Sequence, residues 1–205
     1  MLSNEDVYLG IEPVNANDSY LVKLSFDSGT VDVLPPAVHP LTGAPQRALR
    51  VRAVSFVPDE ALWLVGDLAA VARYPVAPPG DGGAPRLGQG IVVPVASQAN
   101  LRAAWGQGEH LWAAGTNGTT LHFDGAEWHI ENTGTSVTLH AIFGLSPKDI
   151  WAAGDDGTVL HFDGDTWSRV GVGAYRGSLR AIWGSGPDDV WVGGESGLFH
   201  WRALP

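Results

Sequence analysis

The chain has 205 residues, of which 27 are glycine, 9 are tryptophan and none is cysteine, and its formal net charge is −10 at pH 7. The lack of cysteine excludes a disulfide scaffold, a thiolate zinc site, an iron–sulfur cluster and a cysteine nucleophile. Hydrophobic residues make up 44% of the sequence and charged residues 17%, which is enough apolar material for a packed core. The negative charge repels a phosphate backbone and therefore disfavours direct contact with nucleic acid.

The amino terminus and the distribution of apolar residues bear on location. Residues 1–8 contain no basic segment followed by an apolar one, and no stretch of about 18 apolar residues occurs. These observations predict a cytoplasmic protein that does not contact a membrane. Glycine or proline interrupts the chain about every ten residues, which favours short strands and turns over helices.

The first predicted element spans residues 5–35. It begins with Glu5-Asp-Val-Tyr-Leu-Gly-Ile-Glu12, which is similar to Asp188-Asp-Val-Trp-Val-Gly-Gly-Glu195 later in the chain. Phe26-Asp27 falls, after a longer connection, where Phe162-Asp163 falls later. Because only six residues precede Val7, we expect this unit to lack its innermost strand. Residues 35–49 are rich in proline and predict a long surface loop.

The second predicted element spans residues 50–96. It contains Val51-Arg-Ala-Val-Ser-Phe56, followed by Trp63 and Gly66, and is a weaker copy of the units that come after it. Proline and glycine are concentrated in residues 75–90. Such a segment predicts a second surface loop, since proline cannot donate to a strand ladder.

Three closely related units follow, at residues 101–132, 139–172 and 179–205. They open with Leu101-Arg-Ala-Ala-Trp-Gly, Leu139-His-Ala-Ile-Phe-Gly and Leu179-Arg-Ala-Ile-Trp-Gly. Each then carries a Trp-x-x-Gly element, with spacings of 39 and 40 residues between successive tryptophans. With the second unit, the repeat marks these positions: Trp63, Trp112, Trp151 and Trp191, and Gly66, Gly115, Gly154 and Gly194.

Turn signals divide each unit into about four strands. Asn117-Gly118, Asp156-Gly157 and Ser196-Gly197 follow the Trp-x-x-Gly element, and Asp124-Gly125 and Asp163-Gly164 come next. Asn-Gly and Asp-Gly accept the positive φ angles of two-residue hairpin turns. A four-stranded antiparallel meander repeated about every 40 residues is typical of a β-propeller blade. The sequence therefore predicts an all-β fold of about five small blades in a single domain, residues 1–205.

The segment from Leu139 to Trp167 resembles the bacterial Trp-x-x-Gly β-propeller repeats that are abundant in myxobacterial proteins. These repeats are distantly similar to the Asp-box and photosystem II assembly factor propellers. The resemblance covers residues 101–205 well and 50–75 weakly. It departs from an Asp-box, because Asp163-Gly-Asp-Thr-Trp167 is one residue short. The resemblance implies a propeller but no common activity.

Three histidines, His122, His161 and His200, recur at one position of the repeat. We interpret them as partners in a hydrogen bond inside each blade, with Asp124 or Asp163, rather than as ligands of a shared metal. Equivalent positions on neighbouring blades diverge from the axis, so three imidazoles would not easily reach one zinc ion. Neither a metal nor a cofactor is predicted.

The tryptophans and acidic residues each allow two interpretations. Tryptophans at repeat positions are typical of packing between blades, whereas exposed indoles could stack on sugars. Paired carboxylates could serve a glycosidase, but aspartate also favours turns. A sialidase-type site would need more arginines than are found near Tyr175, and no nucleophile elbow, P-loop or H-E-x-x-H motif occurs. The acidic residues concerned are Asp155, Asp156, Asp188, Asp189 and Glu195.

These observations predict a non-enzymatic protein-binding scaffold, a subunit of a multi-protein assembly, whose partner has a basic surface because this chain is acidic. In propellers the hairpin between the second and third strands shares a face with the connection between blades. We expect binding residues on that face: Asn117, Asp155, Asp156, Tyr175, Arg176 and Glu195. A lectin-like propeller is the alternative, and a hydrolase is less favoured. Because both end units are a strand short, the ring is expected to close on itself or with a second chain.

Overall fold

The computed structural model describes residues 6–11, 20–25, 30–33, 50–57, 60–77 and 86–202. The chain divides into two compact units, residues 1–98 and 99–205. Almost every regular element is an antiparallel β-strand, which confirms the predicted all-β class. Among the described residues, no helix has the length and apolar character needed to cross a membrane.

The first unit contains two sheets. One is a three-stranded meander of β1 (Asp6–Ile11), β2 (Tyr20–Ser25) and β3 (Thr30–Val33). The other is built from β4 to β8 around a core of Leu62, Leu64, Ala72 and Tyr74. Its elements are β4 (Val51–Val57), β5 (Ala61–Gly66), the 3-10 turn η1 (Asp67–Ala69), β6 (Val71–Ala77), β7 (Arg86–Leu87) and β8 (Ile91–Val92). Glu5, Glu12, Phe26-Asp27 and the predicted loop 35–49 lie outside the described residues.

The predicted loop at residues 75–90 is partly strand. Pro75 lies within β6 and is paired with Ala61, and β7 pairs with the end of β6. A proline fits here because its position falls between the pairing of β6 with β8 and that with β7, so no partner requires its missing N–H. The Val76 N–H, on the other side, donates to the Glu60 carbonyl at 2.8 Å. Residues 78–85 lie outside the described part.

The second unit consists of three sheets, which we call the third, fourth and fifth blades. The third blade has four strands: β9 (Leu101–Gln107), β10 (His110–Gly115), β11 (Thr120–Phe123) and β12 (Trp128–Glu131), with the 3-10 turn η2 (Thr116–Gly118). The fourth also has four: β13 (Leu139–Ser146), β14 (Asp149–Gly154), β15 (Thr158–Phe162) and β16 (Trp167–Val170). The fifth has three: β17 (Leu179–Gly186), β18 (Asp189–Gly194) and β19 (Gly197–Trp201).

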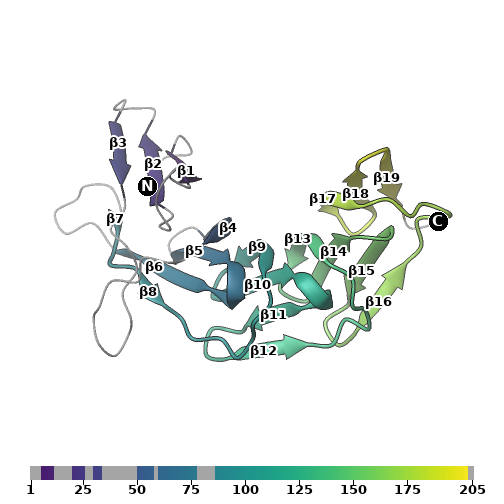
Figure 1. The fold of residues 1–205 in the computed structure, drawn as a ribbon, viewed down its shortest axis with the longest axis horizontal. Coiled ribbons are helices and arrows are strands. Elements are labelled where there is room, and N and C mark those ends of the chain that lie inside the picture. Colours follow the sequence, from purple (N-terminus) through teal and green to yellow (C-terminus); the bar gives the residue numbers. More distant parts are fainter. Residues whose placement is uncertain are drawn as a thin grey trace. The chain divides into compact units, whose positions relative to one another are not determined.

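The core of the second unit lies between its blades. Strand β13 contacts both β9 and β17, and the three sheets stand side by side (Figure 1). One cluster joins Trp112 of the third blade to Ile142 and Ile150 of the fourth. The next joins Trp151 of the fourth blade to Val190 of the fifth. Each blade therefore gives one apolar face to each neighbour, because residues alternate between the two faces of a strand.

The glycines of the Trp-x-x-Gly elements mark close contact between backbones. A Cβ atom at Gly154 would lie 2.2 Å from the Thr138 carbonyl oxygen, just before β13. At Gly115 it would lie 2.3 Å from the Asn100 oxygen. The residue after each glycine then donates its N–H to that same carbonyl, as Asp155 does to Thr138 at 3.0 Å. Only glycine allows the second strand to approach the start of the innermost strand so closely.

Candidate functional site

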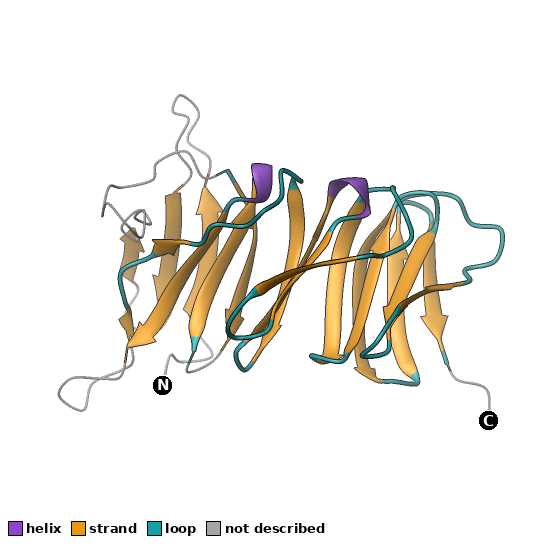
Figure 2. Ribbon diagram, turned by 90° about the horizontal axis from the view of Figure 1, so that it is seen from below, coloured by secondary structure: helices purple, strands orange, loops and turns teal. Residues whose placement is uncertain are grey.

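The six predicted binding residues lie in hairpin turns and in a connection between blades. Backbone hydrogen bonds tie these segments together: the Gly118 N–H donates to Val137 at 2.7 Å, and the Gly157 N–H to Gly177 at 2.9 Å. The turns between second and third strands therefore share one edge of the second unit with the inter-blade connections, which we call the loop edge (Figure 2). Whether a partner binds there stays a prediction.

Asp155 links two blades. Its Oδ1 atom accepts a hydrogen bond from Ser178 Oγ, just before β17, at 2.6 Å, and one from His140 Nε2, in β13, at 2.8 Å. The Ser178 hydrogen bond, followed by that of His140, lowers the pKa of the Asp155 carboxyl. A carboxylate engaged in this way holds the fourth and fifth blades together, and its lone pairs are already in use.

Two arginines flank an open groove at the loop edge, with a volume of about 470 Å³. Arg169 donates to the Asp156 carbonyl at 3.3 Å, and Arg176 to the Tyr175 carbonyl at 2.7 Å. Guanidinium groups placed in this way can bind a carboxylate through charge-assisted hydrogen bonds. The sequence analysis did not single out Arg169; its signal was a break in the repeat, because Ile130 occupies the equivalent position in the third blade.

The remaining predicted residues have different surroundings. Asn117 is exposed in η2 with a φ angle of 58°, and Asp156 has a φ angle of 56° in its turn. Glu195 forms an exposed ion pair with Arg180 at 3.1 Å. Tyr175 is half-buried, with its ring 4.8 Å from that of Phe199. The structure thus brings Asp156 and Arg176 to one groove and gives Tyr175 a packing contact.

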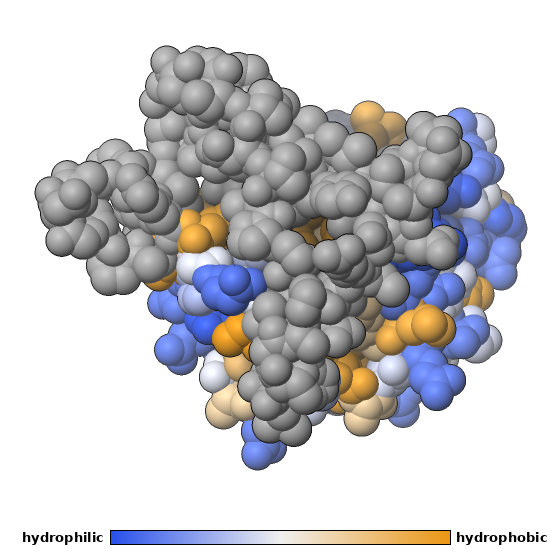
Figure 3. Space-filling view, turned by 60° about the vertical axis from the view of Figure 1, so that its left-hand side comes forward, coloured by the Kyte–Doolittle hydropathy of each residue, from blue (hydrophilic) through white to orange (hydrophobic). Residues whose placement is uncertain are grey.

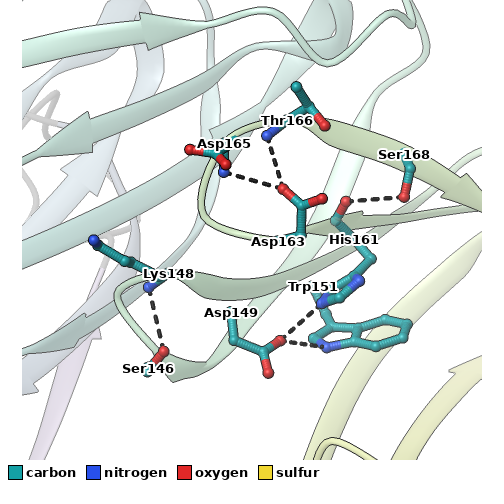
Figure 4. Close-up of polar contacts among 9 residues, drawn as sticks. All are labelled: Ser146, Lys148, Asp149, Trp151, His161, Asp163, Asp165, Thr166 and Ser168. Carbon is teal, nitrogen blue, oxygen red and sulfur yellow. Dashed lines mark hydrogen bonds and ion pairs between the residues drawn. The ribbon is translucent and has the colours of Figure 1, made fainter.

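The repeated histidines hydrogen-bond within their blades, but the predicted aspartates are not their partners. His161 Nε2 lies 2.9 Å from Asp149 Oδ1, and the equivalent His200 lies 2.6 Å from Asp189 (Figure 4). Asp163 lies beyond the end of β15, where its carboxylate accepts the N–H groups of Asp165 and Thr166 and caps the turn. Asp124 caps the matching turn of the third blade and also pairs with His129.

The same aspartates also hold tryptophans. Trp151 Nε1 donates to Asp149 Oδ1 at 3.0 Å, and its ring stacks on His161 with 4.3 Å between centroids. Trp191 repeats both contacts with Asp189 and His200. Hydrogen bonds from Ser185, then His200 and Trp191, lower the pKa of the Asp189 carboxyl. Within the described ranges, no group of three or more His, Asp or Glu side chains is arranged to hold a metal ion.

The fifth blade exposes the face that the other two blades bury. Trp112 and Trp151 are 0% and 2% exposed, whereas the equivalent Trp191 is 37% exposed. Leu198 is 69% exposed although Val159, its counterpart in the fourth blade, is 1% exposed, and Trp183 beside them is 58% exposed. On the side of the molecule seen in Figure 3, by contrast, hydrophobic residues of the described part lie in small groups among hydrophilic ones.

Comparisons with known proteins show the same architecture. No protein-family model matches the sequence, and a comparison with curated proteins gave no match. Among solved structures, YCF48 bound to D1 peptide matches with a TM-score of 0.65 and 18% identity, over 100% of this chain and 62% of that chain. The WD40 β-propeller domain of Doa1 matches with a TM-score of 0.69 and 14% identity, over 98% and 63%. A chain of the mitotic checkpoint complex matches with a TM-score of 0.69 and 16% identity, over 96% and 59%.

These likenesses bear on the fold alone, since each identity is below one fifth. The chain spans about three fifths of the length of the structures it matches. Together with the antiparallel blades and the clusters between them, they establish that the protein has a β-propeller fold.

Proposed function

We propose that this protein is a non-enzymatic scaffold of the cytoplasm that binds another protein, as a subunit of a multi-protein assembly in which a second chain completes the propeller. The observation that carries the proposal is the exposed face of the fifth blade, formed by Trp183, Trp191 and Leu198. A contiguous apolar surface of this kind on a soluble protein marks an interaction site. Its counterparts in the third and fourth blades are both buried against the next blade.

The repeat indicates what covers this face. Trp112 packs against Ile142, Ile150 and Ala152, and Trp151 packs against Val190 and Val192. In both cases the covering surface is the aliphatic face of a neighbouring blade. The occupant of the fifth blade's face is therefore a further blade with the same aliphatic pattern, contributed by another polypeptide. Burial of two indoles and a leucine supplies a large part of the affinity, because aromatic side chains bury 150–250 Å² each.

The loop edge offers a second contact surface. Asn117, Asp156 and Glu195 are exposed or half-buried there on rigid hairpins, which favours recognition by loops on a fixed scaffold. The net charge of −10 favours a partner with a basic surface through electrostatic steering. Two of the matched structures are of propellers with other proteins, one with D1 peptide and one in the mitotic checkpoint complex, which supports a protein partner.

The test compares two variants in affinity capture from a lysate of the source organism. The variant Trp183→Asp/Leu198→Asp places charge on the face of the fifth blade, and Ile130→Asp places it at another exposed apolar position, in β12. We expect a partner that is retained by the wild type and by Ile130→Asp and is lost with the double variant. The purified complex should also protect Trp191 from acrylamide quenching. A partner that binds all three proteins equally, or no specific partner, contradicts the proposal.

Carbohydrate binding is the second candidate, because Trp183 is exposed and indoles stack on sugars. The Trp191 N–H already donates to Asp189, so a sugar would have to use the ring face. A glycan array separates the two functions. Selective binding to one sugar family that is lost in Trp183→Ala would favour the lectin.

A further inference from the structure

The fifth blade lacks a strand that its neighbours possess. In the third and fourth blades, β12 and β16 pair with β11 and β15 as fourth strands. In the fifth, β19 pairs with β18 and is the outer strand among the residues that the structure describes. The outer edge of β19 therefore presents N–H and C=O groups in position for a further strand.

The fourth strand of each complete blade carries a tryptophan at a fixed place. Trp167 lies opposite Phe162 and Trp128 opposite Phe123. The ring of Trp167 packs 5.5 Å from that of Phe162 and 5.8 Å, edge-on, from that of Trp112 in the preceding blade. The tryptophan thus sits between the aromatic end of its own third strand and the repeat tryptophan of the blade before.

The corresponding seat beside the fifth blade is a groove. Trp201 is the counterpart of Phe162 and Trp151 that of Trp112, and their rings lie 6.0 Å apart. Two adjoining depressions, of about 350 and 260 Å³, share Trp151, Val170, Gly171 and Trp201 as walls. Pro187 lines the larger one. The chain thus has a strand edge and an aromatic seat next to each other, and in the fourth blade the same pair of features is filled by one segment.

We propose that β19 and this groove, which we call the strand seat, bind an extended segment of a partner protein as the fourth strand of the fifth blade. The segment pairs antiparallel with β19 and places a tryptophan or phenylalanine opposite Trp201, between Trp201 and Trp151. Main-chain hydrogen bonds give such strand addition its affinity, and the aromatic seat gives it specificity. Arg169 at the rim of the groove favours a carboxylate on the incoming segment.

This site differs from the exposed outer face of the same blade. Val190, Val192 and Phe199 pack toward the fourth blade, on the side of the groove, whereas Trp183, Trp191 and Leu198 are exposed. The two sites can therefore be changed separately. A substitution on the outer face should leave the strand seat intact.

The test uses the full chain and a fluorescent peptide with the sequence of residues 163–172, which contains the fourth strand of the fourth blade. We expect the peptide to bind with a Kd in the micromolar range and to slow amide exchange in residues 198–201 at least tenfold. A peptide in which alanine replaces the tryptophan should bind at least tenfold more weakly. Equal binding of the two peptides, or absence of binding, overturns the proposal.

Matched variants locate the contact. A Cβ atom at Gly171 meets no other atom within 4 Å, so Gly171→Leu should fold normally while it fills the strand seat and reduces binding at least tenfold. Gly186→Leu, also unobstructed, is the control and should bind as the wild type does. Trp183→Asp/Leu198→Asp should bind normally even if the proposed function fails. If exchange in residues 198–201 is already slow in the free chain, light scattering assigns the occupant to the same chain or to a second copy, and the partner segment is refuted.

Discussion

The Nε2 atom of His161 lies 2.9 Å from the Oδ1 atom of Asp149, and that oxygen also accepts the indole N–H of Trp151. One carboxylate therefore orients both members of a stacked pair. In the fifth blade Asp189 does the same for His200 and Trp191. In the third blade His110 stands in place of the aspartate, and Trp112 donates instead to the Pro147 carbonyl of the fourth blade at 3.2 Å.

Removal of this carboxylate should destabilise the second unit. Asp149→Ala leaves two polar hydrogens of His161 and Trp151 without their acceptor, and Trp151 is buried. We expect a loss of about 2 kcal/mol in the free energy of unfolding, measured by urea denaturation. Asp189→Ala should cost less, about 1 kcal/mol or below, because water can reach the exposed Trp191. An equal loss in both variants would contradict this account.

The third blade should respond to pH in its own way. Burial, followed by the charges of His110 and His129, lowers the pKa of His122 from 6.5 to about 4. His122 is then neutral in the folded state between pH 4 and 6.5 while the unfolded chain binds a proton, so stability falls as pH decreases through this range. We expect His110→Asp to raise the pKa of His122 above 6.5, since a carboxylate favours the charged imidazole.

Titration of the histidine ring protons by NMR measures this shift. His110→Asn is the control, because it keeps a hydrogen-bonding group without the negative charge and should raise the pKa of His122 less. Acid destabilisation between pH 4 and 6.5 should be weaker in His110→Asp than in the wild type. An unchanged pKa in His110→Asp would show that burial alone controls His122.

A methyl group at the repeat glycine should be poorly tolerated. In Gly154→Ala the new Cβ would lie 2.2 Å from a backbone oxygen, which cannot move without shifting β13. We expect a destabilisation of about 3 kcal/mol, measured by thermal unfolding. Gly186→Ala meets nothing within 4 Å and should change stability by less than about 0.5 kcal/mol. A stable Gly154→Ala would mean that the Trp-x-x-Gly glycine has another role.

The Asp155 link should make the junction of the fourth and fifth blades sensitive to acid. Hydrogen bonds from Ser178 and His140 lower the pKa of this carboxyl, so its contribution is present above the unfolded pKa and is lost as pH falls through the folded one. Asp155→Asn should therefore reduce stability at pH 7 and leave it nearly unchanged below pH 3. Hydrogen exchange in β17 reports on the junction. Asp165→Asn, an exposed neighbour, should keep the wild-type profile.

The repeat in the sequence predicted the fold because each signal acts locally. Trp-x-x-Gly and the Asn-Gly and Asp-Gly turns depend on positive φ angles and close backbone approach within one blade. The partner of His161 could not be found in this way. It depends on strand register, which places Asp149 diagonally across β14 and β15, whereas the nearer Asp163 lies past the strand end.

The candidate site was predicted less completely. Asp155 was expected to be available to a ligand, but its oxygen is engaged with Ser178 and His140 from segments far apart in sequence. The exposed face of the fifth blade was also outside the reach of sequence analysis. Trp191 and Trp151 occupy the same position of the repeat, and only the presence or absence of a neighbouring blade makes one exposed and the other buried.

The clusters between blades have a consequence for how this protein can change over evolutionary time. Ile150 and Trp151 are consecutive residues, yet one belongs to the cluster before the fourth blade and the other to the cluster after it. A duplicated unit of about 40 residues would carry both halves of this pattern, so it could enter the row without creating an unfamiliar junction. Gene duplication or deletion can therefore alter the number of blades while every remaining contact keeps its chemistry.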